Sequence, residues 1–238
     1  MKLAVLQPGY LPWLGFFDQM NRVDVFVYYD DVQYTRSDWR NRNRVKGPQG
    51  PVWLTVPVLH TARFGQMILE AEIDNRADWA RKHRETLRIH YRRAPHFERY
   101  WPILDEAYGQ RWERLVDLDL FLLERIKDAL GISAATHRSS ALGIGGARVE
   151  RLLAICRHFG ATGYLTGDAA EDYLEPEPFA AGGVEVEYQR YEHPAYPQLY
   201  GDFVPYLSVV DLLFNCGPES RSILARGAGR KVTEARVS

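Results

Sequence analysis

The chain has 238 residues, enough for one large domain or two small ones, and its 46% hydrophobic and 26% charged content is that of an ordinary globular protein. Its 30 Lys and Arg residues against 31 Asp and Glu give a net charge of −1, which argues against a dedicated nucleic-acid-binding protein. No run approaches the roughly 20 apolar residues that span a bilayer, the N-terminal apolar run is too short for a signal peptide, and two scattered cysteines fit a reducing compartment, so we expect a cytoplasmic protein.

A βαβ unit is predicted at the N-terminus. The apolar run at residues 2–6 is typical of a buried strand, and the Pro- and Gly-rich segment 7–12 is typical of a loop. Apolar residues at helical spacing predict a helix over 13–22, and the β-branched and aromatic run at 23–29 predicts a second strand. A strand, a loop, a helix and a strand within about 30 residues indicate a parallel sheet with a right-handed crossover.

The middle of the chain changes from strands to helices. Residues 51–58 and 67–73 are predicted as strands that could pair as a hairpin. Three helices with few interruptions are expected after them, at 76–93, 95–108 and 111–130. The third has an apolar surface broad enough for burial on two sides. The stretch 76–131 is therefore a candidate helical subdomain within a single domain that covers 1–238.

Strands and a helix alternate again in the last part of the chain. We expect a strand at 134–138, an amphipathic helix at 148–159 that ends at Gly160, and strands at 162–166 and 184–191. The tail from Gly227 is expected to fray. The predicted fold class is therefore α/β, with a mainly parallel sheet flanked by helices.

The first candidate site is the loop between the first strand and the first helix. In open α/β sheets, ligands bind beyond the carboxyl ends of strands, often against a helix N-terminus. Gln7, Tyr10 and Trp13 are expected to line such a pocket, where the two aromatic rings could stack on a base or a sugar. Gly9 would let the backbone approach a ligand, and Gly15 would let the helix lie close to the sheet. The alternative is a tight turn with both aromatic residues in the core.

This loop resembles the ATP site of the nucleotidyltransferase-like (HUP-type) α/β folds in its position. Enzymes of that fold usually place two histidines here to stabilise the transferring phosphate. The segment 7–17 contains no histidine. This departure puts adenylyl transfer by that route in doubt.

A basic segment follows the second predicted strand. Arg40, Arg42, Arg44 and Lys46 alternate with other residues and share one face if the chain is extended there. Guanidinium groups bind phosphate or carboxylate through a planar fork, so this face is a candidate anion site, or else a solvated basic loop. The residues expected to bind substrate here are Trp39, Arg40, Asn41, Arg42, Asn43 and Arg44.

Three further side chains with titratable groups are candidates. Asp30 and Asp31, at the end of the second strand, could serve as a general base or hold sugar hydroxyls, or could be capping or turn residues. His83 is a candidate catalytic residue, with Lys82 beside it as a binding residue, although a lone helical histidine is more often structural. His90 shares the face of His83 about 10 Å away, which is too far to chelate one metal ion.

The last candidate site is the segment 191–203, which two prolines hold extended. His193 is the first choice for a general base because its unperturbed pKa is near neutrality, while the alternative is a hydrogen-bonded histidine in a wall loop. Tyr196 and Gln198 suit sugar hydroxyls or an amine. Asp211 and Asn215 would share a helical face, where they could orient the site or cap a neighbouring segment.

No metal site or cofactor motif is recognisable. The chain has no P-loop, no dinucleotide fingerprint, no nucleophile elbow and no CxxC pair, and the remaining histidines show no ligand spacing. The sequence therefore predicts no metal site and leaves the cofactor unknown.

Several of these stretches together resemble the WbqC-like protein family, from about residue 1 to 226. The matching residues are Gln7, Pro8, Tyr10, Pro12, Gly15 and Phe17, then Trp39, Asn41 to Asn43 and Trp53 to Pro57, then Lys82, His83 and Tyr91 to Pro95, then His193 to Gln198, Phe203, Leu207, Ser208 and Asp211 to Asn215. Members occur among genes for O-antigen and related surface polysaccharides. The resemblance implies a transferase that acts on an activated amino sugar.

Three functions are compatible with these observations. The first is N-acyl or aminoacyl transfer, for example of glycine, to the amine of an amino sugar or similar metabolite, with His193 as the base and Asp30 or Asp31 assisting. Its partners would be a small or nucleotide-linked amino substrate and an acyl or aminoacyl donor, aminoacyl-tRNA included, with no membrane insertion and no general nucleic-acid binding. The second is an ATP-dependent ligase or nucleotide-using transferase. The third is a non-catalytic binding or assembly protein, which a large exposed apolar patch in place of a polar pocket would indicate.

Overall fold

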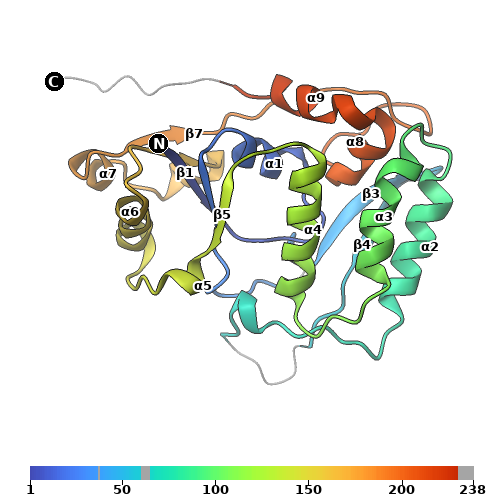
Figure 1. Cartoon of the computed structure of the whole chain (residues 1–238), viewed down its shortest axis with the longest axis horizontal. Coiled ribbons are helices and arrows are strands. Elements are labelled where there is room, and N and C mark those ends of the chain that lie inside the picture. The colour runs from blue at the N-terminus through green and yellow to red at the C-terminus, as the bar shows by residue number, and fades with distance from the viewer. Residues whose placement is uncertain (37, 60–64, 230–238) are drawn as a thin grey trace.

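A five-stranded parallel sheet lies at the centre of the protein (Figure 1), in a computed structural model that describes residues 1–36, 38–59 and 65–229. Its strands are β1 (Lys2–Leu6), β2 (Val25–Tyr28), β5 (Ala135–Arg138), β6 (Gly163–Thr166) and β7 (Glu185–Tyr188). Their order in the sheet is β5-β2-β1-β6-β7. The chain moves outward from β1 to one edge, then returns to the other side of β1. The sheet is therefore doubly wound, and its order reverses between β1 and β6.

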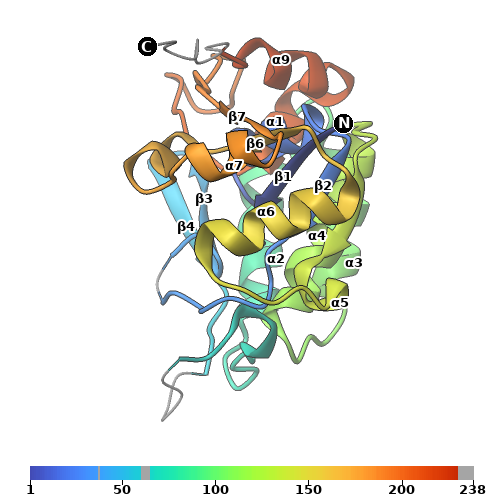
Figure 2. The same cartoon turned by 90° about the vertical axis from the view of Figure 1, so that its left-hand side faces the viewer.

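Helices cover both faces of this sheet. Successive side chains of a strand point to opposite faces, so Ala4 and Phe26 enter one core while Leu3 and Val25 enter the other. The first core lies under α1 (Leu14–Asn21) and α4 (Leu115–Ala129), and the second under α6 (Arg148–Phe159) and α7 (Glu177–Ala181). Figure 2 shows α6 lying across the strands on its own face. Burial on both faces explains why β2 consists entirely of buried apolar residues.

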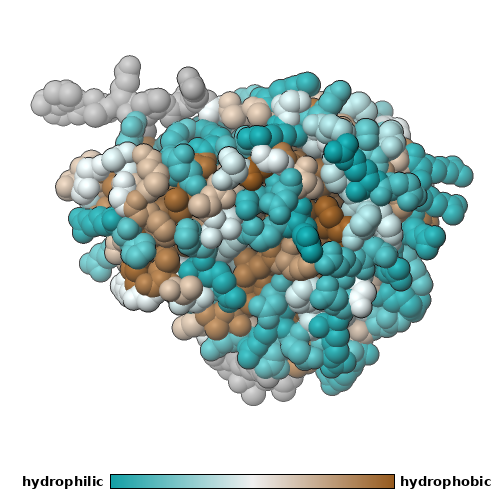
Figure 3. All heavy atoms as spheres, in the orientation of Figure 1, coloured by the Kyte–Doolittle hydropathy of each residue, from teal (hydrophilic) through white to brown (hydrophobic). Residues whose placement is uncertain are grey.

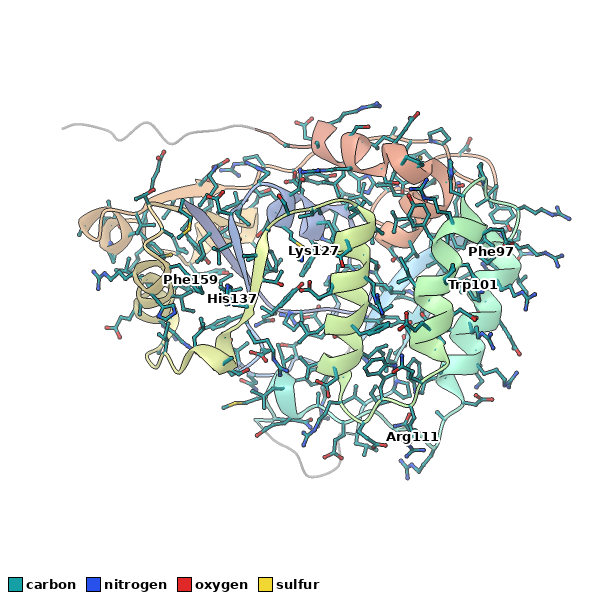
Figure 4. The ribbon with its side chains drawn as sticks, in the orientation of Figure 1. Phe97, Trp101, Arg111, Lys127, His137 and Phe159 are labelled. Atoms are coloured by element: carbon teal, nitrogen blue, oxygen red, sulfur yellow. The ribbon has the colours of Figure 1, made fainter. Side chains whose placement is uncertain are left out.

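The helical half of the chain shares the first core. It contains α2 (Trp79–Tyr91) and α3 (Phe97–Tyr108), which pack beside α4, and the C-terminal helices α8 (Val209–Cys216) and α9 (Ser220–Arg226). Phe97 stacks on Trp101 (Figure 4) with ring centroids 5.0 Å apart, and lies 5.1 Å from the ring of Phe214 in α8. Burial of Leu115, Leu118 and Leu122 along α4 agrees with the broad apolar surface predicted for this helix.

Most predicted elements are present, but the predicted strand at 67–73 is wrong. It contains instead the 3-10 turn η1 (Ile68–Glu70), because the Glu70 carboxylate accepts a hydrogen bond from the Met67 N–H at 3.0 Å and closes the turn. The hairpin of this region is formed by β3 (Arg42–Gly47) and β4 (Gly50–Thr55). β4 ends before Pro57, which has no N–H to donate to a ladder.

Short elements complete the fold. They are α5 (Ser139–Leu142), η2 (Asp168–Asp172) and η3 (Gly217–Glu219). Both cysteines are buried free thiols. In the face shown in Figure 3, hydrophilic residues cover the side of α2 and α3, and hydrophobic residues are more frequent toward α5 and α6. In the described ranges, no helix is long and apolar enough to cross a membrane. The tail predicted to fray falls largely at 230–238, outside the described residues.

Candidate functional site

A cavity of about 1060 Å³ opens at the carboxyl ends of β1 and β6. Leu6 and Gln7 line one side of it, and Thr166 and Gly167 line the other. This is the point where the strand order reverses, and ligands of open α/β sheets bind in the crevice at such a point. Its further walls come from the loop after β1, the segment before β3, the start of α6 and the segment after β6, and include Pro8, Gly9, Trp13, Trp39, Arg40, Asn43, Arg148, Glu150, Tyr173 and Glu175.

The loop after β1 is held against the segment before β3 by its backbone. The Tyr10 N–H donates to the carbonyl oxygens of Trp39 (3.2 Å) and Arg40 (3.1 Å), and the Asn43 side-chain amide donates to the carbonyl of Leu11 at 2.8 Å. A Cβ at Gly9 would lie 2.8 Å from the Trp39 carbonyl oxygen, so a glycine is needed for this approach. Two sequence motifs predicted separately therefore meet in one wall of the cavity.

Gly15 has a different role from the one predicted. A Cβ there would lie 2.2 Å from the indole of Trp13, which folds back over the start of α1. The glycine makes room for this ring, and the expectation that it lets the helix approach the sheet is wrong. Trp13 is thereby positioned as a wall of the cavity.

Tyr10 points away from the cavity into the core. Its hydroxyl hydrogen-bonds Nδ1 of His83 at 2.8 Å and also the hydroxyl of Tyr108, and all three rings are buried. Burial lowers the pKa of His83 to about 4, so the imidazole is neutral at pH 7. Lys82 is exposed on α2, so the helix separates this predicted pair. In this geometry His83 supports the loop from behind.

The basic residues of β3 alternate as predicted, but they are not equivalent. Lys46 is only 2% exposed, and its ammonium donates to the carbonyl oxygens of Asp202 (2.5 Å) and Gly201 (3.4 Å). Arg40 precedes the strand, pairs with Asp38 and lines the cavity. Arg42 and Arg44 remain on the outward face, over the ring of Trp53.

Asn41 is buried and serves the hairpin. Its side-chain amide donates to the carbonyl of Val56 at 2.8 Å, and the Val56 N–H donates back to the Asn41 carbonyl at 2.8 Å. Asn41 does not line the cavity, whereas its neighbours Arg40 and Asn43 do.

The two carboxylates after β2 are occupied by other protein groups. Asp30 is fully buried and accepts hydrogen bonds from Arg138 (2.7 Å) and from the N–H (3.0 Å) and hydroxyl (2.8 Å) of Ser140. Burial alone would raise the pKa of Asp30, but these hydrogen bonds hold it below its ordinary value. Asp31 pairs with Arg151 and accepts from Ser139. Both act as capping and pairing groups at the start of α5.

His193 lies behind the cavity wall. It is half-buried, its ring stacks on Trp13 with centroids 6.3 Å apart, and its Nδ1 hydrogen-bonds the carbonyl of Pro194 at 3.1 Å. Its Nε2 is buried without a hydrogen-bond partner, and burial lowers its pKa. It shares no hydrogen bond with Asp30 or Asp31, whose partners are those given above. His193 therefore contacts the cavity only through Trp13.

Four other predicted binding residues meet one another in a buried network. Asp211 accepts hydrogen bonds from Tyr91 (2.7 Å), Tyr196 (3.0 Å) and Gln198 (2.9 Å), and the Asn215 side-chain amide donates to the Asp211 carbonyl at 2.7 Å. None of them lines the cavity. Burial raises the pKa of Asp211, against the effect of its three donors. The network holds the segment 191–203 onto α8.

Sequence reasoning missed the second wall of the cavity. Arg148 and Glu150 begin α6, Thr166 is the last residue of β6, and Tyr173 and Glu175 follow that strand. The signal was available, because the strand at 162–166 was predicted and the rule on carboxyl ends of strands applies to it as well as to the first strand.

The cavity lining combines apolar rings with a few polar groups. Its ionisable side chains include two cations, Arg40 and Arg148, and two carboxylates, Glu150 and Glu175. Gln7 Oε1 and Arg40 Nε are both buried without a hydrogen-bond partner. Within the described ranges, no group of His, Cys, Asp and Glu is placed to hold a metal ion. The cavity can therefore contact a flat or apolar ligand that also carries hydrogen-bond donors and negative charge.

Comparison with known proteins relates this chain to others over nearly all its length. The profile of the WbqC-like protein family matches residues 7–223, which contain every wall of the cavity except Val5 and Leu6. The uncharacterized protein Rv1507c of Mycobacterium tuberculosis is 40% identical over 225 residues, which cover 94% of this chain and 97% of that protein. No solved structure matches the chain.

Proposed function

This chain belongs to the WbqC-like protein family, and from that premise we propose that it is a cytoplasmic transferase. It would move an acyl or aminoacyl group, of the glycyl type, to the amine of an activated amino sugar or similar metabolite. The product would serve surface-polysaccharide or specialised-metabolite biosynthesis. The acceptor would be a small or nucleotide-linked amino compound, and the donor an acyl or aminoacyl carrier, aminoacyl-tRNA included.

The observation that carries this proposal is the cavity between β1 and β6. Its volume of about 1060 Å³ is slightly above the roughly 300–1,000 Å³ of small-molecule sites. Group transfer needs an acceptor and a donor side by side, and a cavity of this size gives room for both. Its position at the reversal of strand order supports a binding role independently of its size.

The lining offers groups for each part of the reaction. Arg40 and Arg148 can hold a phosphate of the acyl or aminoacyl carrier, and Gln7 Oε1 can accept a hydrogen bond from an amine or a hydroxyl. In the transfer, the amine nitrogen attacks the acyl carbonyl, a C–N bond forms, and the C–S or C–O bond of the donor breaks. The amine proton passes to a base and then to the leaving group. Glu150 and Glu175 are the carboxylates that line the cavity, so we assign this base to one of them.

In this proposal His193 is a positioning residue for Trp13. It stacks on Trp13, and Trp13 forms part of the cavity wall. In this reading its imidazole fixes the indole against the substrate and transfers no proton.

The direct test is product formation by the full-length protein. Nucleotide-linked amino sugars are paired with acyl-coenzyme A compounds or with aminoacyl-tRNA, and the products are weighed by mass spectrometry. The expected result is an amide whose mass exceeds that of the amine by the acyl residue. Loss of the product in Glu150→Gln or Glu175→Gln would identify the base. If no amine in the panel is acylated with either kind of donor, the proposal fails.

A second candidate is an ATP-dependent ligase or nucleotide-using transferase. The strand order and the opening of the cavity at the loop between β1 and α1 favour it, since nucleotidyltransferase-like folds use this junction. Against it, the cavity lining contains no histidine among the described residues. Release of AMP or ADP that depends on both an acid and an amine would support it, and the absence of any ATP turnover would exclude it.

A further inference from the structure

Two tryptophans and two arginines lie close together on the outward face of the β3–β4 hairpin, where Trp39 comes from the segment just before β3. Trp39 is 48% exposed and Trp53 is 46% exposed, with ring centroids 5.7 Å apart and planes inclined by 36°. The guanidinium carbons of Arg42 and Arg44 lie 4.5 and 5.6 Å from the centre of the Trp53 ring. We refer to Trp39, Trp53, Arg42 and Arg44 as the hairpin platform.

The period of the hairpin places these side chains together. Arg44 is directly opposite Trp53 in the antiparallel register, and Arg42 is two residues from Arg44 on the same face. Asn43 and Val45, on the opposite face, are buried. The platform therefore belongs to the outer side of a strand pair whose inner side is core.

The positive charge of the platform is not balanced by neighbouring carboxylates. Among the residues that the structure describes, none forms an ion pair with Arg42 or Arg44, whereas Arg40 pairs with Asp38. Arg44 Nε is buried without a hydrogen-bond partner. Two large aromatic surfaces left in solvent beside two free guanidinium groups are unusual, because large apolar side chains are mostly buried. They complement a ligand that is both flat and anionic.

The platform is continuous with the cavity and firmly held. Trp39 lines the cavity as well as contacting Trp53. The Trp39 carbonyl accepts the Tyr10 N–H at 3.2 Å, and the Arg44 carbonyl accepts the Ser208 N–H at 2.8 Å. A ligand on the platform can therefore extend into the cavity along a rigid edge.

We propose that the hairpin platform binds the nucleotide part of the substrate outside the cavity. The base stacks on the exposed indole faces of Trp39 and Trp53, the diphosphate lies against the guanidinium groups of Arg42 and Arg44, and the group attached to the diphosphate enters the cavity. The inference rests on the proposed function, because it assigns the nucleotide of that activated substrate. It leaves the cavity to the amino sugar and the acyl donor.

This arrangement has a consequence for specificity. Every base has an aromatic face, and stacking on rings without hydrogen bonds to the base edges tolerates all of them. The platform side chains are two indoles and two guanidinium groups, which recognise an aromatic ring and a negative charge and make no hydrogen bond that depends on the identity of the base. Recognition of the base is therefore weak and recognition of the diphosphate is strong.

The experiment measures binding of UDP, CDP, GDP and ADP, and of the four matching nucleosides, to the full chain by calorimetry. The four diphosphates are expected to bind within about tenfold of one another, and the nucleosides much more weakly. Trp39→Ala and Trp53→Ala should weaken diphosphate binding by about 5- to 150-fold, which is the range for loss of one stacked base. Trp39→Phe keeps an aromatic face and should restore most of the affinity. Arg42→Ala should abolish the advantage of diphosphates over nucleosides.

Controls separate the platform from the cavity and from damage to the fold. Arg111→Ala removes an exposed arginine in the connection between α3 and α4, at the lower end of these helices (Figure 4), and should bind diphosphates as the parent does. Thermal melts of each variant identify any that is unfolded, and Trp39→Phe then carries the test. Diphosphate binding that persists in the platform variants but is lost in Arg148→Ala would overturn the platform and leave the transferase proposal standing.

Two other results would also overturn the platform. One is no binding of any nucleotide by a protein that still acylates an amine. The other is binding of a short single-stranded RNA, lost in the same variants, more than 100-fold tighter than that of any diphosphate, which would make RNA the occupant. The transferase proposal is judged separately, by product formation.

Discussion

The Tyr10 hydroxyl hydrogen-bonds the Nδ1 of His83 at 2.8 Å inside the core, behind the loop that forms one wall of the cavity. The same hydroxyl contacts the hydroxyl of Tyr108, so one side chain ties the loop to α2 and α3. Tyr10, which the sequence predicts to line the pocket, thus stabilises the cavity wall from the side of the core.

Removing that hydroxyl should cost stability. Tyr10→Phe leaves the buried Nδ1 of His83 without its partner, and an unsatisfied buried polar group costs about 1–3 kcal/mol of unfolding free energy. Urea denaturation followed by circular dichroism measures the difference. Tyr173→Phe, at a ring that is 73% exposed, is the matched control and should change stability by less than about 0.5 kcal/mol.

His83 should make the protein sensitive to acid. The pKa of His83 is about 4 in the folded protein and about 6.5 in the unfolded chain. Between these two pH values the unfolded chain binds a proton at His83 and the folded protein does not. The contribution of His83 to stability is complete above pH 6.5 and falls by about 1.4 kcal/mol per pH unit down to pH 4. Denaturation curves at pH 4–7 should show this slope in the parent and not in His83→Gln. Equal slopes in the two proteins would contradict the assignment.

Asp119 should have the opposite effect. It is fully buried in α4, neither carboxylate oxygen has a hydrogen-bond partner, and burial raises its pKa well above the ordinary value. Above pH 3.8 the unfolded chain loses this proton while the folded protein keeps it, so the contribution of Asp119 to stability falls as the pH rises toward its folded pKa. Asp119→Asn should therefore be more stable than the parent at pH 7, and the difference should become smaller as the pH falls. A variant that is less stable than the parent at every pH would contradict the raised pKa of Asp119.

Asp211 and Arg148 should separate stability from activity. Asp211→Ala leaves the buried hydroxyls of Tyr91 and Tyr196 without an acceptor and should lower the unfolding free energy by about 2–4 kcal/mol. Arg148→Ala removes an exposed side chain in the cavity lining, so the melting temperature should hardly change while KM for a phosphate-bearing substrate rises at least tenfold. Measured side by side, the two variants distinguish a structural network from a binding wall. If Arg148→Ala lowered the melting temperature and Asp211→Ala raised KM, Arg148 would be the structural residue and Asp211 the binding residue.

His193 offers a test between two roles. If it positions Trp13 by stacking, His193→Phe should keep most of the turnover, whereas His193→Ala should lose more because the indole is no longer packed. If it is the general base, both variants should lose about 10²- to 10⁴-fold in kcat. The ratio of kcat between the Phe and Ala variants, together with their KM values, decides between them.

The sequence predicted the sheet well because its signals are local. The β-branched and aromatic run of β2, the helical spacing of α6 and the stop at Gly160, whose φ is 65°, depend on neighbouring residues only. The site was harder to predict because it depends on contacts between distant segments. Nothing within the segment 7–13 tells whether Tyr10 faces the cavity or His83, 73 positions further along the chain. In the same way, the side chain of Asp211 meets its partners Tyr91, Tyr196 and Gln198 only in the folded protein.

The connection from β2 to β5 is the part of this fold whose sequence and length can change without disturbing the sheet. A crossover between neighbouring parallel strands needs little more than one helix, yet here residues 29–134 lie between them and include the hairpin platform, η1 and all of α2 to α4. Both ends of this excursion are fixed by the pairing of β2 with β5, so its interior can be rebuilt without altering the register of the sheet. Relatives that share the doubly wound sheet could thus exchange one ligand for another by changing this single connection. A chimera that swaps residues 29–134 between two members would carry the hairpin platform and the helices α2 to α4 with it, while the cavity residues from Arg148 to Glu175 would remain those of the recipient.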